Sequence, residues 1–504
     1  MALVNQFLAG AVAIASLLLL WFLFMAGSSK QSNKAWAQLV VVGISPGDGP
    51  LSWAFALAKS VISMQETMRE GYEKFSKANK PFALPTMWIG GAVLVLPPSK
   101  LGLLNKPRNE LSSFNALLEN AQFQYLMSDK DVWGNTIHFD IVRRHLREKD
   151  MSSLTKIMFE EWQGAFQTYW GDSKDGRVIK AWDSMVRIIA RAALRIMVGL
   201  PGLEMKTIWS SQDLAGPVIA LRAKYYERKL LNLLIPLVEE RLFQYRHGVG
   251  SQRDSQGDVI EWLIEVSENH GPEQLTAKKI AGRILALTSM FVFAIGWVFV
   301  HVVLDIHCSP SSDEIVRTLM AECQQISAQY QELSSKEAID KLYRLDPAVR
   351  ESMRLNDVMV HLLPLDIISG QPVNIGEGIQ ISAESGLRTV FPAQMIHHDQ
   401  DIYQNPERFD AFRFSREHET SSNEQPTTAK RESVTTVSTT FLPFGYGRHA
   451  CPGRWFVAYM VKQATAYALL HYDVEVTKGP RKRASLLNFM LPPQKAELRV
   501  TRRQ

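Results

Sequence analysis

The chain has 504 residues, of which 46% are hydrophobic and 21% are charged, and its formal net charge is +5. This composition is that of a globular protein with an ample core, and no repeat or linker divides the middle of the sequence, which favours one large domain. The lysines and arginines are dispersed rather than gathered in a tract, so nucleic-acid binding is not expected. Cys308, Cys323 and Cys451 are too few for a disulfide framework and lack the close pairing of a zinc site, so we expect a reducing compartment.

The N-terminus contains an uncharged apolar stretch at residues 7–27, long enough to cross a hydrocarbon core of about 30 Å as a helix. A cleaved signal peptide is the alternative, but such peptides have a charged leader and a shorter apolar core, whereas nothing before Lys30 is charged here. Lys30 and Lys34 place the downstream chain on the cytoplasmic side. We therefore expect residues 1–28 to be a single-pass membrane anchor, residues 29–50 a connector, and residues 51–504 the globular domain.

Helical periodicity dominates the globular domain. It is found in residues 51–77, 153–199 and 218–247. Residues 81–98 and 373–390 have the bias of short strands, and the polar residues 417–440 are expected to form an exposed, mobile loop. The apolar run at residues 284–304 is long enough for a second membrane span, but we prefer a buried core helix. The sequence thus predicts a mainly α fold with small β-sheets.

A glycine-rich loop near the C-terminus presents one cysteine directly before a helical pattern that starts at Arg454. The sequence of this loop is Phe444-Gly445-Tyr446-Gly447-Arg448-His449-Ala450-Cys451-Pro452-Gly453. Nearby cations and a helix N-terminus both favour the thiolate form of cysteine, which is the form that binds metals. Glycines also let a flat, bulky partner approach the backbone closely. The loop therefore predicts a metal-binding thiolate at Cys451, the alternative being a buried structural cysteine on a tight turn.

A Glu-x-x-Arg pair, Glu351 and Arg354, lies one turn apart in the helical run of residues 346–355. This spacing alone means little, because it also begins at Glu66 and at Glu314. The pair at Glu351 differs by its place before the segment Asn405-Pro406-Glu407-Arg408-Phe409-Asp410-Ala411-Phe412-Arg413-Phe414.

Together these segments resemble the cytochrome P450 family, and residues 449–454 resemble the microsomal enzymes of filamentous fungi in particular. The resemblance covers nearly the whole chain and implies the cytochrome P450 fold. It implies heme b with Cys451 as the axial thiolate, which donates electron density that favours O–O cleavage. The other residues expected at the heme are Phe444, Gly445, Gly447, Gly453 and His449, the last as a propionate partner.

The same resemblance implies that Glu351, Arg354 and Arg413 form a buried triad. A carboxylate between two guanidiniums can satisfy several charge-assisted hydrogen bonds and so lock the loop that carries the thiolate. The alternative is an exposed ion pair with an unrelated Arg413.

One departure from the family pattern concerns the distal helix, expected within residues 280–305. Phe293 and Ala294 stand where the family has an acid and an alcohol, and neither side chain can relay a proton. Three hypotheses stay open: a water or substrate hydroxyl serves as relay, a one-residue shift recruits Thr288 or Ser289, or the enzyme does not use ordinary oxygen activation.

A second departure is the missing arginine soon after the Glu-x-x-Arg helix. Residues 356–386 contain no arginine or lysine, and His361 is the only cation candidate there. Arg143 or Arg144 is a further propionate candidate, although a solvated helix face explains both at least as well.

The resemblance further implies a monooxygenase of the endoplasmic reticulum membrane, with its heme-thiolate catalytic domain in the cytoplasm. Its expected substrate is an apolar small molecule, a terpenoid-type intermediate of fungal secondary metabolism, and its expected electron donor is NADPH-cytochrome P450 reductase. The expected pocket residues are Phe291, Phe293, Ala294, Trp297 and Phe489. The alternative is an atypical heme-thiolate enzyme that catalyses rearrangement, dehydration or cyclisation, and a heme-binding protein without catalysis is a third class.

Overall fold

The computed structural model describes eleven stretches of the chain. They are residues 39–44, 50–86, 91–107, 109–135, 137–199, 216–248, 257–376, 378–383, 387–416, 432–480 and 483–503. The expected membrane anchor at residues 1–28, most of the connector, and the larger part of the loop expected at residues 417–440 lie outside the described residues.

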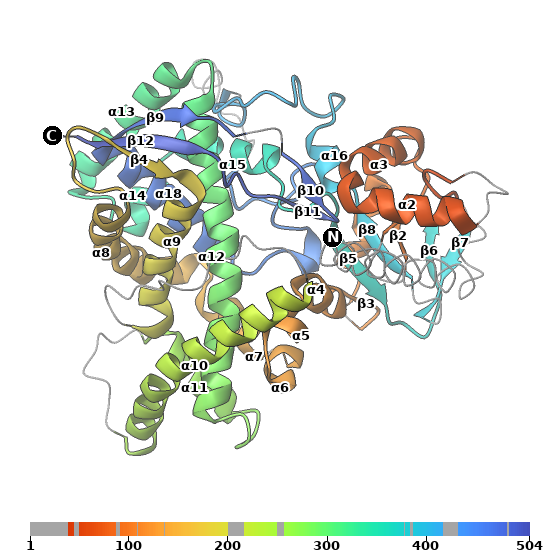
Figure 1. Ribbon diagram of the computed structural model, residues 1–504, viewed down its shortest axis with the longest axis horizontal. Helices are drawn as coiled ribbons and strands as arrows, with labels where there is room; N and C mark the ends of the chain where they lie inside the picture. The colour runs from red at the N-terminus through yellow and green to blue at the C-terminus, as the bar shows by residue number, and fades with distance from the viewer. Residues whose placement is uncertain are drawn as a thin grey trace, which may run out of the picture.

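Helices form most of the described chain, as the sequence predicts (Figure 1). The α-helices are α2 (Pro50–Ile62), α3 (Met64–Gly71), α4 (Phe114–Ala121), α5 (Phe123–Leu126), α6 (Lys130–Gly134), α7 (Ile137–His145), α8 (Met151–Tyr169), α9 (Ala181–Val198), α10 (Gly216–Arg246), α11 (Val259–Glu268), α12 (Ala277–Cys308), α13 (Ser312–Tyr330), α14 (Lys336–Asp340), α15 (Leu345–Leu355), α16 (Ala393–His397) and α18 (Arg454–His471). Short 3-10 or π-helical turns are η2 (Tyr72–Ser76), η3 (Pro98–Asn105), η4 (Glu148–Asp150) and η7 (Gly447–His449).

The strands are short and gather in small sheets. They are β1 (Phe82–Pro85), β2 (Ala92–Val95), β3 (Leu111–Ser112), β4 (Arg177–Lys180), β5 (Leu362–Ile367), β6 (Val373–Gly376), β7 (Ile379–Ile381), β8 (Arg388–Phe391), β9 (Tyr472–Lys478), β10 (Ser485–Leu486), β11 (Phe489–Met490) and β12 (Glu497–Arg502). The largest sheet has the order β1-β2-β8-β5-β3, and only its β2–β8 pair is parallel. Strands therefore form where residues 81–98 and 373–390 predict them.

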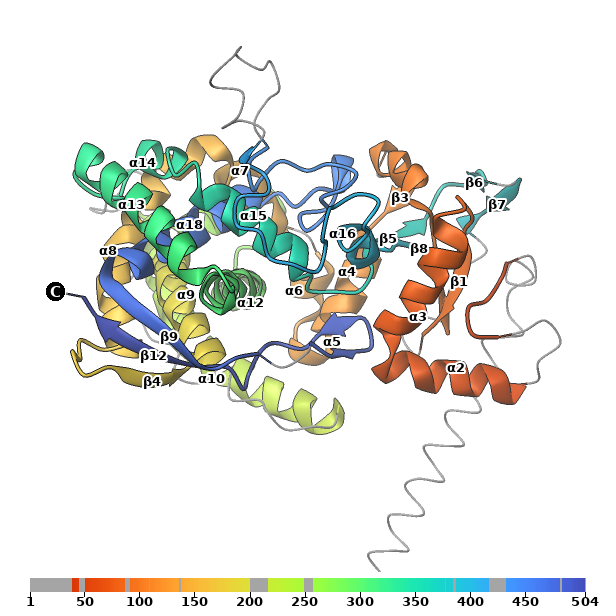
Figure 2. The ribbon, with the colours of Figure 1, turned by 90° about the horizontal axis from the view of Figure 1, so that it is seen from above.

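The largest sheet lies with α2 and α3 to one side of the helical part of the molecule, and α12 passes through the middle of that helical part (Figure 2). Helix α12 begins after Thr276, whose side chain accepts a hydrogen bond from the backbone N–H of Lys279, and it ends two residues before Pro310, which cannot continue a helix. It is long and apolar enough to cross a membrane, but 72% of its most apolar window is buried inside the protein. The structure therefore agrees with the expected core helix.

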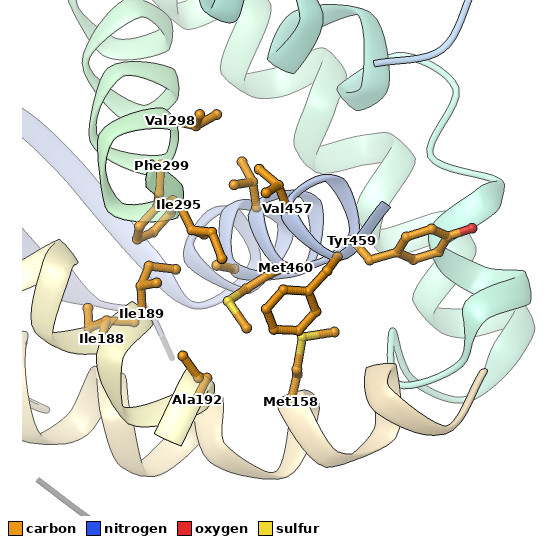
Figure 3. Close-up of a cluster of buried hydrophobic side chains, with 14 of the residues drawn as sticks. Met158, Ile188, Ile189, Ala192, Ile295, Val298, Phe299, Val457, Tyr459 and Met460 are labelled. Atoms are coloured by element: carbon orange, nitrogen blue, oxygen red, sulfur yellow. The ribbon is translucent and has the colours of Figure 1, made fainter. Parts of the chain in front are cut away.

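The hydrophobic core forms where α8, α9, α12 and α18 meet (Figure 3). Side chains that point into it recur at helical spacing, as Ile188, Ile189 and Ala192 do on α9. Ile295 and Phe299 point from α12 toward Met460 of α18. This core fixes α12 against α18, the helix that follows Cys451.

Candidate active site

The cysteine loop is closed by a hydrogen bond from the backbone N–H of Cys451 to the carbonyl of Phe444 (2.7 Å). Gly445 and Gly447 have φ angles of +76° and +60°, in the left-handed region that side chains disfavour. A Cβ atom at Gly447 would also lie 3.0 Å from the carbonyl oxygen of Leu104 in η3. These two glycines are therefore required by the turn of the loop and by its packing, before any partner is considered.

The surroundings of Cys451 act in both directions on its ionisation. Burial raises the pKa of the Cys451 thiol, while a hydrogen bond from the Gly453 backbone and the charge of Arg454 oppose this rise. Arg454 also donates to the carbonyl of Cys451 (2.9 Å), and its guanidinium lies over the ring of Trp455. A bound metal cation would act in the same direction as Arg454 and favour the thiolate.

The structure brings Glu351, Arg354 and Arg413 together. Glu351 accepts hydrogen bonds from Arg354 Nε (2.8 Å) and Nη2 (2.9 Å) and from Arg413 Nε (3.0 Å). Glu351 and Arg354 are fully buried, which excludes the exposed ion pair. Arg354 also donates to the carbonyls of His397 and Pro406, so the cluster holds two segments that precede the cysteine loop.

Helix α12 lies directly against the start of α18. The rings of Phe291 and Phe456 meet edge to face with centroids 5.4 Å apart, and a Cβ atom at Gly453 would be 3.5 Å from Phe291. Phe293 and Ala294 are partly buried, and Phe293 contacts the ring of Trp182 from α9. The structure therefore places the expected distal stretch beside the cysteine loop.

Trp297, one of the expected pocket residues, packs in the protein interior. Its side chain is 1% exposed, and its indole N–H donates to the carbonyl of Asn356 (2.8 Å), so it belongs to the core between α12 and the end of α15. Phe489 lies on the β10–β11 hairpin, where it forms a bridge with Met359 and remains partly buried. The side chain of the adjacent Asn488 accepts a hydrogen bond from the backbone N–H of His361.

The hydroxyls considered as substitute relays are both engaged by their own helix. Thr288 donates to the carbonyl of Ile284 (2.7 Å) and Ser289 to that of Ala286 (2.9 Å). Thr288 is also buried. To donate a proton to a bound ligand, either hydroxyl would first have to leave this bond to its own helix.

Among the expected propionate partners, His449 lies 3.2 Å from the hydroxyl of Ser113 through its Nδ1 atom. Arg143 and Arg144 are exposed on α7, and Arg143 pairs with Asp140, which agrees with a solvated helix face. Burial lowers the pKa of His361 to about 3, so this residue is neutral at pH 7 and is not the expected cation.

Sequence patterns missed the residues that join α12 and α15 to the site. Asp305 accepts hydrogen bonds from Ser352 and Asn356, and Arg350, next to the triad, is fully buried. Arg350 follows Asp346 by four residues, a spacing that usually indicates a surface ion pair. The sequence feature that could have indicated the burial of Arg350 is its position beside Glu351, on a helix that is expected to be buried.

The chemistry at Cys451 fits a metal held mainly by a non-protein group. Among the described residues, no group of three or more His, Cys, Asp or Glu side chains could hold a metal ion. A metal bound to Cys451 would therefore take its other ligands from outside the protein, as iron does in a porphyrin. A single cysteine thiolate with such a partner is the arrangement found in heme-thiolate proteins.

Comparisons with known proteins agree with this class. The cytochrome P450 family model matches residues 228–500. The chain is 28% identical to cytochrome P450 monooxygenase gloP of Glarea lozoyensis, over 89% of this chain and 88% of the relative. It is also 28% identical to cytochrome P450 monooxygenase htyF of Aspergillus rugulosus, over 93% and 72%.

A solved structure, the heme domain of cytochrome P450DA, shares the fold with a TM-score of 0.65 at 15% identity, over 92% of this chain and 98% of that chain. The present chain belongs to the cytochrome P450 family, and it is a cytochrome P450 monooxygenase. Family membership implies a heme whose iron is bound by the thiolate of Cys451.

Proposed function

We propose that this monooxygenase oxidises an apolar small molecule, a terpenoid-type intermediate of fungal secondary metabolism. The proposal of an apolar substrate rests on the surface of α12 beside the cysteine loop. There Phe291, Phe293 and Ala294 are partly buried and carry no polar side-chain atom. The fungal monooxygenases among its relatives support the biological setting. Electrons would come from NADPH-cytochrome P450 reductase, and residues 1–28 would hold the enzyme in the endoplasmic reticulum membrane.

The overall reaction consumes substrate, dioxygen, NADPH and a proton, and yields hydroxylated substrate, water and NADP⁺. When bound, heme supplies the site at which dioxygen is reduced with electrons from the reductase. Cys451 would bind the iron, while Gly453 N–H and Arg454 stabilise the charge on the sulfur. The triad of Glu351, Arg354 and the partly exposed Arg413 fixes the chain that leads to this loop.

On the distal side these residues of the chain would offer apolar surface rather than a proton relay. Phe291 and Phe293 present rings, and the hydroxyls of Thr288 and Ser289 point into their own helix. Proton delivery would therefore depend on an ordered water or on a hydroxyl of the substrate.

The test is product analysis after expression of the full chain with a reductase and candidate terpenoid precursors under labelled dioxygen. We expect an NADPH-dependent product that contains the label, and Cys451→Ala should abolish both the product and the thiolate band of the reduced carbon monoxide complex. Turnover without NADPH and dioxygen would support rearrangement, dehydration or cyclisation instead. A normal thiolate band with no substrate-dependent spectral change would contradict the proposed substrate class.

A further inference from the structure

The chain segment that leads into the cysteine loop is held by a second buried arginine of α15. Arg350 is 0% exposed, and its Nη1 donates to the carbonyls of Ser433 (2.7 Å) and Thr436 (2.7 Å). Its Nη2 donates to Glu432 (2.7 Å). One guanidinium thus fixes three residues that lie more than eighty positions further along the chain.

The same guanidinium packs on two aromatic rings. Its central carbon lies 3.7 Å from the centroid of the Phe441 ring and 4.7 Å from that of Phe414. Phe441 is fully buried and lies three residues before Phe444, whose carbonyl accepts the hydrogen bond from Cys451. Arg350 is therefore connected to the thiol by a short, rigid piece of backbone.

Asp346, one turn before Arg350 on α15, contacts the chain on both sides of the loop. One carboxylate oxygen accepts a hydrogen bond from the backbone N–H of Val434 (2.8 Å). The other accepts from Lys462 (3.0 Å), which lies on α18 after the loop. Because both partners are buried with it, Asp346 ties the segment before Cys451 to the helix after it.

These contacts differ from those of the triad. Arg354 and Arg413 hold the backbone of residues 404–408 and His397, whereas Arg350 and Asp346 hold residues 432–436 and α18. A buried charge that loses its partners is strongly unfavourable, so both contacts fix their segments in one position. The two sets together tie α15 to the segments that precede the cysteine loop and to the helix that follows it.

We propose that Arg350, supported by Asp346, is a positioning residue that sets the orientation of the Cys451 sulfur toward the heme iron. The inference rests on Cys451 as the iron ligand and extends it, since the residues that orient a ligand tune its bond to the metal. Lysine cannot replace Arg350, because a single ammonium lacks the planar fork that reaches two carbonyls and a carboxylate while stacking on aromatic rings.

The test compares Arg350→Lys and Arg350→Met with matched substitutions of Arg283 in the full-length holoenzyme. Arg283 is also fully buried, but it lies on α12 and bonds to Gln274, away from the cysteine loop. The readouts are the fraction of the reduced carbon monoxide complex that shows the thiolate band, the rate at which this band is lost, and the melting temperature.

We expect the Arg350 variants to lose the thiolate band about tenfold faster than the wild type, in line with the usual effect of residues behind a metal ligand. The Arg283 variants should lower the melting temperature without changing this rate. Equal rates in both pairs at equal loss of melting temperature would overturn the inference, because Arg350 would then be structural only.

Two further variants keep the inference testable if Arg350→Met does not fold. Asp346→Asn retains an acceptor for Val434 and loses the charge opposite Lys462, so its thiolate band should be lost faster than in the wild type but more slowly than in the Arg350 variants. If neither Asp346→Asn nor Arg350→Lys changed the rate at which the band is lost, the proposal would be overturned. Cys451→Ala should remove the band itself, and a band that survived this change would overturn the assignment of the ligand as well.

Discussion

Phe293 and Ala294 of α12 offer no proton relay at the expected distal side of the site. Both side chains lack a proton that can be transferred, and the nearby Thr288 and Ser289 hydroxyls donate to backbone carbonyls of their own helix. If ordered water or substrate relays the protons instead of a fixed hydroxyl, we expect a share of the reducing equivalents to be released as hydrogen peroxide.

Ala294→Thr is therefore expected to increase the share of NADPH that appears in product, by up to about tenfold, because it introduces a hydroxyl beside the site. The measurement is product formed and peroxide released per NADPH consumed. Ala294→Val is the matched control, since valine has the shape of threonine without its hydroxyl. Equal coupling in the two variants would show that bulk, not proton transfer, is responsible.

Asp305 is a buried carboxylate whose ionisation opposes folding. Burial raises its pKa to about 6, although hydrogen bonds from Ser352 and Asn356 and the charge of Arg483 act in the opposite direction, and Glu351 adds to the rise. An unfolded aspartate titrates near pH 4. Between about pH 4 and pH 6 the folded state therefore binds more protons than the unfolded state, so stability falls as pH rises. Above about pH 6 the full penalty, about 3 kcal/mol, is present.

Asp305→Asn should remove this penalty while its amide oxygen still accepts from Ser352 and Asn356. We expect the free energy of unfolding to increase by about 1 to 3 kcal/mol near pH 7.5 and to change much less near pH 4, where the folded carboxyl is protonated and little of the penalty is present. Chemical unfolding of both proteins at the two pH values measures this. A gain that is the same at both values would contradict the assigned titration.

At the scale of elements, the contact between α9 and α12 depends on one glycine. A Cβ atom at Gly296 would lie 2.8 Å from a methyl group of Val186, whose branched side chain cannot turn away freely. Gly296→Ala gains about 1 kcal/mol in helix propensity, but overpacking costs about 1 to 3 kcal/mol. The net result should be destabilisation by about 1 kcal/mol.

A double-mutant cycle separates these two effects. Val186→Ala should create the space that the new methyl group needs, so Gly296→Ala is expected to stabilise the Val186→Ala background while it destabilises the wild type. Unfolding free energies of the four proteins measure the coupling. Additive changes would mean that the two helices move apart at no cost.

The same elements show what the sequence could predict. The apolar run of α12, the strands near residues 81–98, the cysteine loop and the Glu-x-x-Arg pair carry local patterns that survive in the structure. Trp297 carries no such pattern, because helical spacing allows its side chain to face either a pocket or the core. Its packing in the core depends on a hydrogen bond to the carbonyl of Asn356, 59 residues away, which the sequence does not indicate. Arg350 is similar, because its partners at residues 432–436 are set by tertiary packing.

At the scale of the whole molecule, the cysteine loop contacts both the largest sheet and the helical part. Leu363 of β5 reaches Gly445 of the cysteine loop, and its φ of +58° is unusual for a leucine. Phe291 approaches the same loop from α12. The sheet and the helices therefore have to be assembled together before the loop has its final shape, which is why folding and metal binding are expected to be coupled.

On the side of the molecule formed by α2, three large apolar side chains are exposed along one helix. Leu51, Phe55 and Ile62 are 64%, 74% and 73% exposed, while Trp53 and Leu57 on the inner face are buried. An exposed apolar stripe of this kind is a contact surface or a cause of aggregation. Helix α2 begins 22 residues after the proposed anchor of residues 1–28 ends.

Removal of residues 1–28 tests the anchor against this stripe. If the anchor alone holds the enzyme in the membrane, the shortened chain should leave the membrane fraction and keep its thiolate band, since Cys451 and its supporting contacts all lie within residues 51–504. Sedimentation of membranes, followed by spectroscopy of both fractions, measures this. A shortened chain that still sediments with membranes would contradict sole anchoring by residues 1–28. If Phe55→Glu together with Ile62→Glu then released this shortened chain, the remaining attachment would be assigned to α2, because two charges on that face oppose burial in lipid.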